Sequence, residues 1–426
     1  MDIINDIISK GISLMSEQKY EAAKKEFELA IENDPKSYDA YIHLGNACAN
    51  LGEFGEAITA FKNALIINEN SGEALFSIAN IYLLKDEKLK AVEFYNKSEK
   101  AGYKRAELYQ ILASIFFDVD DIPQALRNIT RAIDVEPLNG ELRLFKTRIY
   151  LAVNKYDEAL ETLDEMNKIL PDAYETYNLR SQIYCSQGKY REALEICEQG
   201  CLRFPDDPNI SLIKLKALVD MQKDLDASKL IATMKSNGQY DAVLKEAAIQ
   251  ESIIHLRKND VSTTLGLLDA ANNALDGDSD LIYLMMDVYG KTENYEKTME
   301  MAEKLIAMGS NEHYEYTARY FRAHSMDKLG KTEEAKVEYK NLTSLLRKAT
   351  INNPAFYEGY IYRLLCHTHL GEFDKAFELA DYLENLHPER SDAHTFRYFI
   401  YKEQGDLEKA EKSREKAIKL NPNVNL

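Results

Sequence analysis

Three features are scarce in this chain of 426 residues: cysteine, basic charge and long apolar runs. The five cysteines are an odd number and lack the density of a disulfide framework, so we expect a reducing compartment and no disulfide. Acidic residues outnumber basic ones by 71 to 53, which gives a net charge of −18 with neutral histidine. Because such a field repels phosphate backbones and anionic membranes, nucleic acid and membrane surfaces are not expected partners.

Targeting and membrane segments are also missing from the sequence. No run of about eighteen consecutive apolar residues occurs, as a transmembrane helix would need. The N-terminal stretch MDIINDIISKGISLMSEQ has acids and a lysine among its apolar residues, so it lacks the apolar centre of a signal peptide. We therefore expect a soluble cytoplasmic protein, and the abundance of Ile, Lys, Asn and Tyr indicates a bacterial source with AT-rich coding sequence.

Common catalytic signatures are absent as well. The patterns H-E-x-x-H, G-x-S-x-G and C-x-x-C, which carry metalloprotease, serine hydrolase and thiol redox chemistry, do not occur. The triplet GKT occurs at residues 290–292 and 330–332, but a phosphate-binding loop needs another glycine five residues earlier, where Met285 and Ser325 stand. The sequence predicts no enzyme, no catalytic residue and no cofactor.

An internal repeat of 34 residues is the strongest feature that is present. It is marked by alanines at one position of each unit, and the same frame resumes later in the chain: Ala23, Ala57, Ala91, Ala125, Ala159, Ala193 and Ala227, then Ala335, Ala376 and Ala410. Six of the nine prolines also share one position of the frame: Pro35, Pro137, Pro171, Pro205, Pro388 and Pro422. A proline there is expected to end a helix.

Residues 40–65, AYIHLGNACANLGEFGEAITAFKNAL, show the pattern within one unit. The spacings W-x2-L-G-x2-Y and A-x3-F are matched, with Tyr and Cys in place of larger aromatics, by Tyr41, Leu44, Gly45, Cys48, Ala57 and Phe61. This pattern resembles the tetratricopeptide repeat family over about twelve units, from Ile4 to Val424. The resemblance implies an all-α fold, a right-handed superhelical α-solenoid of about twelve helix hairpins.

The residues support helix hairpins without the resemblance. Each unit has apolar residues at i, i+3, i+4 and i+7, then a short turn with Gly or Asn, then a second helical period that ends near proline. Such short helices are marginal alone, so each hairpin must pack on the next, and small residues must let the backbones approach. Gly11, Gly45, Ala79 and Ala113 are predicted to do this on the first helices. Gly45 is therefore expected to be a packing residue and Gly52 a turn residue, rather than parts of a phosphate-binding loop.

Changes in regularity divide the chain into three segments. Residues 1–207 form a regular arm of six repeats, 208–356 a divergent middle, and 357–426 a C-terminal repeat pair with a polar cap at 407–420. Insertions of three, three and seven residues follow Ala227, Thr298 and Ala335, and Thr264 and Thr298 replace the packing alanine. We expect a bend or hinge around residues 208–312; docking of a dedicated partner there is the alternative interpretation.

The two ends of the repeat array differ in polarity. The first helix carries an apolar stripe broader than one partner helix would cover, formed by Ile3, Ile4, Ile7, Ile8 and Ile12. This stripe predicts self-association or a partner at the N-terminal end. In the last helix Arg414 takes the position of the aromatics Phe27, Phe61 and Tyr95, which is typical of a polar cap.

Two clusters in the sequence contain residue types that can bind a metal ion or pack in the core. One is Cys185, Cys197 and Cys201, and the other is Cys366, His367 and His369. Cys197 and His367 occupy aromatic core positions of their units, and a buried cysteine behaves as a small hydrophobe. We favour packing and predict no metal site.

Acidic residues occupy the second position of the first helix in nine units: Asp39, Glu73, Glu107, Glu141, Glu175, Glu246, Asp280, Glu358 and Asp392. A carboxylate in a first helical turn stabilises the helix by about 0.3–1 kcal/mol through the helix dipole. In the tetratricopeptide repeat family these positions also border the concave groove, so the row would favour a basic peptide by electrostatic steering. Both interpretations stay open.

The resemblance places candidate binding residues on the groove-facing positions of the first helices. One row contains Asn46, Asn80, Arg148, Gln182, Asp287 and His324. A second row contains Ile42, Phe76, Gln110, Leu144, Asn178, Tyr283 and Tyr320. The amides could bond a peptide backbone and the apolar members could bury part of a ligand, but polarity for solubility alone would give a similar pattern.

Two known ligand classes of the family do not fit. The clamp for a C-terminal carboxylate of chaperones would need Lys, Asn and Arg where Ile42, Asn46, Ser77, Glu107 and Ile111 stand. A sustained asparagine ladder of the sugar-transferase type is missing, because Asn46 and Asn80 have no successors in their row. The ligand class stays open.

The main functional hypothesis is an interaction scaffold or adaptor whose groove binds a peptide or a partner protein. The second is a regulatory switch that changes pitch when a peptide binds and thereby releases a partner. The third is an enzyme without a recognisable motif. Because repeat folds serve many unrelated functions, the sequence identifies neither the partner nor the pathway.

Overall fold

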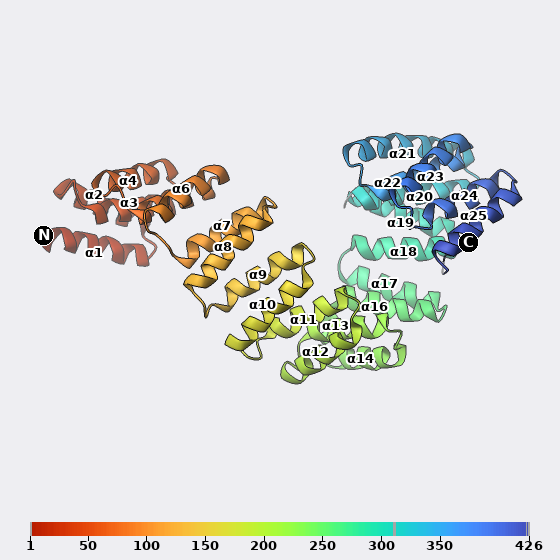
Figure 1. Cartoon of the computed structure of the whole chain (residues 1–426), viewed down its shortest axis with the longest axis horizontal. Helices are drawn as coiled ribbons and strands as arrows, with labels where there is room; N and C mark the ends of the chain where they lie inside the picture. Colours follow the sequence, from red (N-terminus) through yellow and green to blue (C-terminus); the bar gives the residue numbers. More distant parts are fainter. Residues whose placement is uncertain (1, 310–311, 423, 425–426) are drawn as a thin grey trace. The chain divides into compact units, whose positions relative to one another are not determined.

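The computed structural model describes residues 2–309, 312–422 and 424. Within these ranges the secondary structure consists of 25 helices without a strand (Figure 1), which confirms the all-α solenoid. None of the helices in this described part combines the length and the apolar content that crossing a membrane requires.

The bounds of the helices are α1 (Asp2–Ser16), α2 (Tyr20–Asn33), α3 (Tyr38–Asn50), α4 (Phe54–Ile67), α5 (Gly72–Leu84), α6 (Lys88–Lys100), α7 (Ala106–Asp118), α8 (Ile122–Val135), α9 (Gly140–Ala152), α10 (Tyr156–Ile169), α11 (Tyr174–Ser186), α12 (Tyr190–Arg203), α13 (Pro208–Asp220), α14 (Asp224–Ser236), α15 (Gln239–Ala242), α16 (Leu244–Arg257), α17 (Val261–Ala274), α18 (Ser279–Lys291), α19 (Tyr295–Met308), α20 (Glu312–Lys328), α21 (Thr332–Asn352), α22 (Tyr357–His369), α23 (Phe373–Leu386), α24 (Asp392–Glu403) and α25 (Leu407–Leu420).

All of these helices except the short α15 pair into twelve hairpins of a first and a second helix. The first helices are α1, α3, α5, α7, α9, α11, α13, α16, α18, α20, α22 and α24. In the first unit α3, α5 and α7 begin at one position of the repeat frame, at Tyr38, Gly72 and Ala106. In the second unit α20 reaches 17 residues because part of an insertion lengthens it.

The chain divides into two compact units, Met1–Pro205 and Asp206–Leu426. The first unit contains α1–α12 and the second contains α13–α25. The segments predicted at 1–207, 208–356 and 357–426, and the hinge around residues 208–312, stay predictions.

The turn inside each hairpin passes through one residue with a left-handed backbone. In the first unit this residue recurs every 34 residues, at Gln18, Gly52, Asp86, Asp120, Asn154 and Gly188. Gly, Asn and Asp adopt positive φ with the least strain, which explains why they dominate this position. The φ of +78° at Gly52 confirms its turn role. The recurring prolines follow the second helices; Pro35, for example, lies two residues beyond the end of α2.

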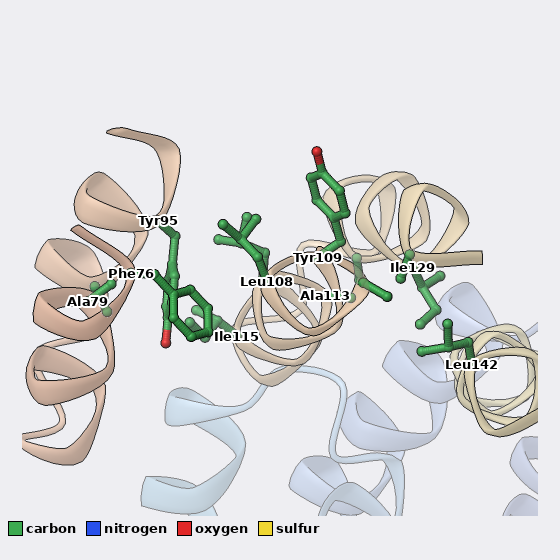
Figure 2. Close-up of a cluster of buried hydrophobic side chains, with 14 of the residues drawn as sticks. Phe76, Ala79, Tyr95, Leu108, Tyr109, Ala113, Ile115, Ile129 and Leu142 are labelled. Carbon is green, nitrogen blue, oxygen red and sulfur yellow. The ribbon is translucent and has the colours of Figure 1, made fainter. Parts of the chain in front are cut away.

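The hydrophobic core runs between hairpins as a chain of clusters. In one of them α5 to α9 contribute fully buried residues such as Ala91, Leu108 and Ile129. Figure 2 shows Phe76 and Tyr95 side by side, with ring centroids 5.5 Å apart. Since helices of this length are marginal in isolation, this burial between neighbours supplies most of their stability.

Small residues on the first helices fit against aromatic rings of the second helices, as predicted for Gly11 and Gly45. A Cβ at Gly11 would lie 2.4 Å from the ring of Phe27, and one at Gly45 would lie 2.5 Å from the ring of Phe61. Both rings are almost completely buried. The glycines therefore admit the rings, and Gly45 belongs to the packing of its hairpin.

The insertions in the second unit have distinct structural results. The first adds α15 between α14 and α16, and the second falls where α20 reaches 17 residues. The third insertion lengthens a helix and forms no additional loop. It extends α21 to 21 residues, whereas the other second helices have 13 or 14. Buried Thr264 and Thr298 take the place of packing alanines, and each hydroxyl donates to a carbonyl four residues earlier.

Replacing Gly45 by alanine is expected to lower the free energy of unfolding by about 1–3 kcal/mol, because the added methyl group overlaps the Phe61 ring. The matched control is Gly55→Ala in α4, where an added Cβ meets nothing within 4 Å. The control should be neutral or stabilising by up to about 1 kcal/mol. Urea denaturation followed by circular dichroism measures both, and equal effects of the two changes would contradict the packing role.

Candidate functional site

Several first helices contact the first helix of the neighbouring hairpin directly. These pairs are α1 with α3 and α3 with α5 in the first unit, and α13 with α16, α18 with α20 and α20 with α22 in the second. The predicted binding residues all lie on first helices. Their exposure decides which of them can meet a partner.

Three apolar candidates are buried instead of open to a groove. The exposed fractions of Ile42, Phe76 and Leu144 are 4%, 6% and 3%. Each belongs to a hydrophobic cluster between hairpins, where it contacts the neighbouring helices. The structure differs here from the expectation for Ile42, Phe76 and Leu144, because these three side chains pack against neighbouring helices and serve as core.

The polar candidates of the first unit remain accessible to different extents. Gln110, Arg148 and Gln182 are exposed, whereas Asn46, Asn80 and Asn178 are half-buried. Internal hydrogen bonds occupy part of this set: the Tyr95 hydroxyl donates to Oδ1 of Asn80, Nδ2 of Asn178 donates to the Tyr174 hydroxyl 2.7 Å away, and Nε2 of Gln182 donates to Oδ1 of Asn178.

The side chains of Asn46, Gln110 and Arg148 make no hydrogen bond or ion pair with other residues in the described ranges. Since an amide can both donate and accept, and a guanidinium carries five donors, these three side chains retain their capacity to bind a partner.

The acidic row lies in first helical turns as predicted. Asp39, Glu73, Glu107 and Glu141 occupy the first turns of α3, α5, α7 and α9, and all four are exposed. In the second unit Asp280 is instead engaged, because Lys245 forms an ion pair with it and the Tyr314 hydroxyl donates to it. The first unit therefore presents exposed carboxylates on the same helices as the accessible polar candidates.

The candidates of the second unit lie in an aromatic environment. Tyr283 is stacked on Tyr314 with ring centroids 4.9 Å apart. The carboxylate of Asp287 is half-buried and forms an ion pair of 2.6 Å with Nζ of Lys291. Asp287 is therefore already paired with a cation of its own helix.

Tyr320 and His324 of α20 meet residues of α21 and α22 that the sequence did not connect with them. We name this set the tyrosine–histidine cluster: Tyr320, His324, Tyr339, Tyr362 and His369. The Tyr320 hydroxyl lies 3.2 Å from Nε2 of His369, within hydrogen-bonding distance. Tyr339 is stacked on the His369 ring with centroids 4.9 Å apart, and the two histidine rings are 5.2 Å apart.

Burial sets the charge of this cluster. Together with a smaller effect of the neighbouring His369, it lowers the pKa of His324 to about 4. Burial also lowers the pKa of His369 and raises the pKa of Tyr362 to about 12. At neutral pH the cluster consists of neutral imidazoles and protonated phenols, so none of its groups is charged or an activated nucleophile.

Two polar atoms of the cluster are buried and make no hydrogen bond within the part of the chain that the structure describes: Nδ1 of His324 and the Tyr339 hydroxyl. Such groups normally find a partner, because an unpaired buried polar atom costs about 1–3 kcal/mol. Tyr339 and Tyr362 carried no direct sign of this role in the sequence, and His369 was considered there only as a possible metal ligand, because the cluster forms through packing between three different helices. The available signal was an excess of Tyr and His between 314 and 369.

In the described part of the chain, neither candidate metal cluster of the sequence brings three ligand atoms close together. Nδ1 of His367 lies 2.6 Å from the Glu372 carboxylate, whereas His369 stacks on Tyr339. Cys197 and Cys366 are buried core residues.

Among the described residues, candidate ligands gather within one short distance only at Cys48, Glu53 and Glu56. There Nζ of Lys24 lies 2.7 Å and 2.6 Å from the two carboxylates, and burial raises the pKa of the Cys48 thiol to about 11. A lysine therefore already balances these acids.

Comparison with known families agrees with this architecture. Models described as tetratricopeptide repeat match residues 8–71, 116–183 and 399–424. The chain is a tetratricopeptide repeat protein. The matched segments lie near both ends and in the regular arm of this tetratricopeptide repeat protein, and the hairpins between them continue the same pattern.

Curated relatives match this tetratricopeptide repeat protein over short stretches. It is 29% identical over 93 residues to the general transcriptional corepressor trfA of Dictyostelium discoideum, which covers 22% of this chain and 7% of that protein. It is 26% identical over 132 residues to tetratricopeptide repeat protein 6 of Homo sapiens, which covers 31% of this chain and 25% of that protein. The chain thus spans a quarter or less of either relative.

Several solved structures are similar to this chain. YrrB, described as a TPR protein with an unusual peptide-binding site, has 21% identity and a TM-score of 0.37, with 43% of this chain and 95% of YrrB covered. The APC/C hetero-tetramer Cut9–Hcn1 has 12% identity and a TM-score of 0.43, with 99% of this chain and 94% of that chain covered. At these identities the likeness concerns the fold alone.

The stability of the second unit should depend on pH through His324. Because the pKa of His324 is about 4 in the folded state and near 6.5 in an unfolded chain, the unfolded state binds more protons between these values. Its stabilising contribution is complete above about pH 6.5 and is lost as the pH falls toward 4. Near His324, Asp327 opposes this effect, whereas Lys328 and His369 add to it.

The variant His324→Gln should reduce the loss of stability between pH 7 and pH 4 by about 1–3 kcal/mol, measured by urea denaturation at each pH. The control is His387→Gln, which replaces a half-buried histidine outside the tyrosine–histidine cluster and should keep the pH dependence of the wild type. A variant His324→Gln with an unchanged pH dependence would contradict the assignment.

Proposed function

We propose that this tetratricopeptide repeat protein is a non-enzymatic scaffold or adaptor that binds a peptide or partner protein on its layer of first helices. The observation that carries the proposal is the set of accessible side chains Asn46, Gln110 and Arg148, which stand on well-packed helices and keep their hydrogen-bonding groups uncommitted. Rigid helices that present unpaired donors and acceptors lose little entropy when a peptide binds.

The charge of the first helices supports a basic segment as the partner. Exposed Asp39, Glu73, Glu107 and Glu141 recur at one position of successive hairpins, and the chain carries a net charge of −18. A regular row of carboxylates raises the rate of encounter with a cationic peptide and makes that rate sensitive to salt. Arg148 would then contact an acidic or carbonyl group within such a peptide.

Exposed apolar residues on α1 support a contact at the N-terminal end. Ile4, Ile7 and Ile8 pack within the first hydrophobic cluster, but Ile3 and Ile12 are 72% and 43% exposed. We include self-association through this helix in the proposal, together with the cytoplasmic location and bacterial source inferred from composition.

Selection of peptides from a phage-displayed library on the immobilised full chain tests whether the first helices bind a peptide. Peptides with basic residues are expected, and their affinity should fall at least tenfold in the triple variant Asn46→Ala, Gln110→Ala, Arg148→Ala. The matched control removes the same residue types from exposed positions of second helices: Asn96→Ala, Arg127→Ala, Gln199→Ala. Equal affinity for both triple variants, or no enriched sequence, would refute the proposed surface.

A second candidate function is a peptide-responsive switch that sequesters or releases a partner. The division into two compact units supports it, because two separately packed bodies can respond to a ligand without unfolding either core. Small-angle X-ray scattering with a saturating selected peptide should then show a changed radius of gyration. An identical scattering profile with and without peptide would count against the switch and would leave the scaffold intact.

A further inference from the structure

A pocket of about 690 Å³ lies among α21, α22 and α23. Figure 1 shows these three helices in the second unit, where α22 contacts both α21 and α23. Its lining comes from three helical stripes spaced by three or four residues. They are Lys340, Thr343, Ser344 and Arg347 on α21, Tyr360, Arg363 and His367 on α22, and Lys375, Glu378, Leu379 and Tyr382 on α23. Residues at such spacings share one face of a helix, so three faces converge on the pocket.

The lengthened α21 builds one wall of this pocket. The other second helices have 13 or 14 residues, and α21 has 21, so its last two turns have no counterpart in the regular units. Arg347 lies in this additional part, and so does Thr350, whose Oγ1 accepts a hydrogen bond of 3.1 Å from Nη1 of Arg363. The extension thus positions two of the cationic groups.

Cations of the pocket have few anionic partners. Neither Lys340 nor Arg347 forms an ion pair or hydrogen bond through its charged end with a residue that the structure describes. Arg363 contacts Thr350 and the Tyr360 ring, with Cζ 5.9 Å from the ring centroid, but no described carboxylate. Its Nε is buried and unpaired. Lys375 differs, since its Nζ lies 3.0 Å from Glu372.

This arrangement is unusual for a chain with so many acids. Burial lowers the pKa of Arg363, and the charge of Arg347 lowers it further, so the two guanidinium groups repel each other across the pocket. Surface cations elsewhere in the chain are commonly paired, as Lys24 is with two glutamates. Gathering unpaired like charges costs free energy that a bound anion would recover.

The aromatic, apolar and acidic residues of the lining indicate which other groups the ligand contains. Tyr360 and Tyr382 lie against each other with ring centroids 4.7 Å apart, and Leu379 adds apolar surface. Aromatic walls of this kind favour a planar apolar group. Glu378 is the one carboxylate in the lining and would accept a hydrogen bond from a hydroxyl or amino group. The volume falls in the range of about 300–1,000 Å³ typical of small-molecule sites and far exceeds what a bare phosphate needs.

We propose that this pocket binds a phosphate monoester with a planar ring, held by Lys340, Arg347 and Arg363 at the phosphate and by the two tyrosines at the ring. A nucleoside monophosphate and a phosphotyrosyl side chain both have this chemistry. The proposal concerns a different surface from the layer of first helices and does not depend on it. Three cations and the Ser344 hydroxyl suit the three terminal oxygens of a phosphate better than the two of a carboxylate.

Isothermal titration calorimetry of the full chain tests the proposal with four probes: AMP, O-phosphotyrosine, adenosine and inorganic phosphate. At least one of the two phosphate esters should bind saturably at one site per chain. Adenosine, which lacks the phosphate, and inorganic phosphate, which lacks the ring, should each bind at least tenfold more weakly. The preferred ester then distinguishes a nucleotide from a phosphotyrosyl source. No saturable binding of either ester would overturn the proposal, and phosphate binding as tightly as the esters would overturn the role of the tyrosines.

Two double variants of α21 separate the pocket from general electrostatics. Lys340→Gln with Arg347→Gln removes two lining charges and should weaken ester binding at least tenfold. Lys336→Gln with Lys348→Gln removes the same charge from the same helix outside the lining and should leave the affinity within about twofold, as expected for screened surface charges. All four residues are at least partly exposed, so both variants should fold, which circular dichroism checks. Equal weakening by both variants would overturn the site.

Discussion

The close approach of the two helices within each hairpin is the contact on which the rest of the structure depends. Gly11 and Gly45 leave room for the rings of Phe27 and Phe61. On the second helices, fully buried alanines such as Ala23 and Ala57 are the small residues of the packed face. Once these positions are fixed, the rotation of each helix about its axis is fixed too, because neighbouring positions differ by about 100°. Every other side chain is then assigned to a core, to a neighbouring hairpin or to solvent.

That assignment explains how far the sequence could describe the molecule. Periodic alanines, prolines and turn residues predicted twelve hairpins and most of their first residues, because each signal acts within one unit. The role of Gly52 and Gly45 followed from the same frame. Local repetition is therefore the part of this fold that a single sequence specifies best.

The candidate binding surface was harder to predict for two reasons. The side chains of Ile42 and Asn46 lie only one turn apart on α3, so a small rotation of the helix changes how far each of them is buried against the neighbouring helices. The apolar character of Ile42, Phe76 and Leu144 was a sign of burial that the family pattern alone did not convey. The tyrosine–histidine cluster depends on three helices at once, and no single repeat contains the information that brings His324 and His369 together.

The lengthened α21 shows how a regular repeat array can change its surface without losing its register. Its seven additional residues amount to nearly two whole turns. The side chains after the insertion therefore point in almost the same direction as those before it, with a mismatch of about 20°. Tyr339, Leu342 and Leu346 therefore keep one continuous buried edge while the other edge gains new side chains. An insertion of five residues would have turned the following hairpin by about 140° relative to its neighbour. Helical repeats of this kind thus accept additional residues in whole turns. Such insertions enlarge the surface of one hairpin without changing how the next hairpin packs on it.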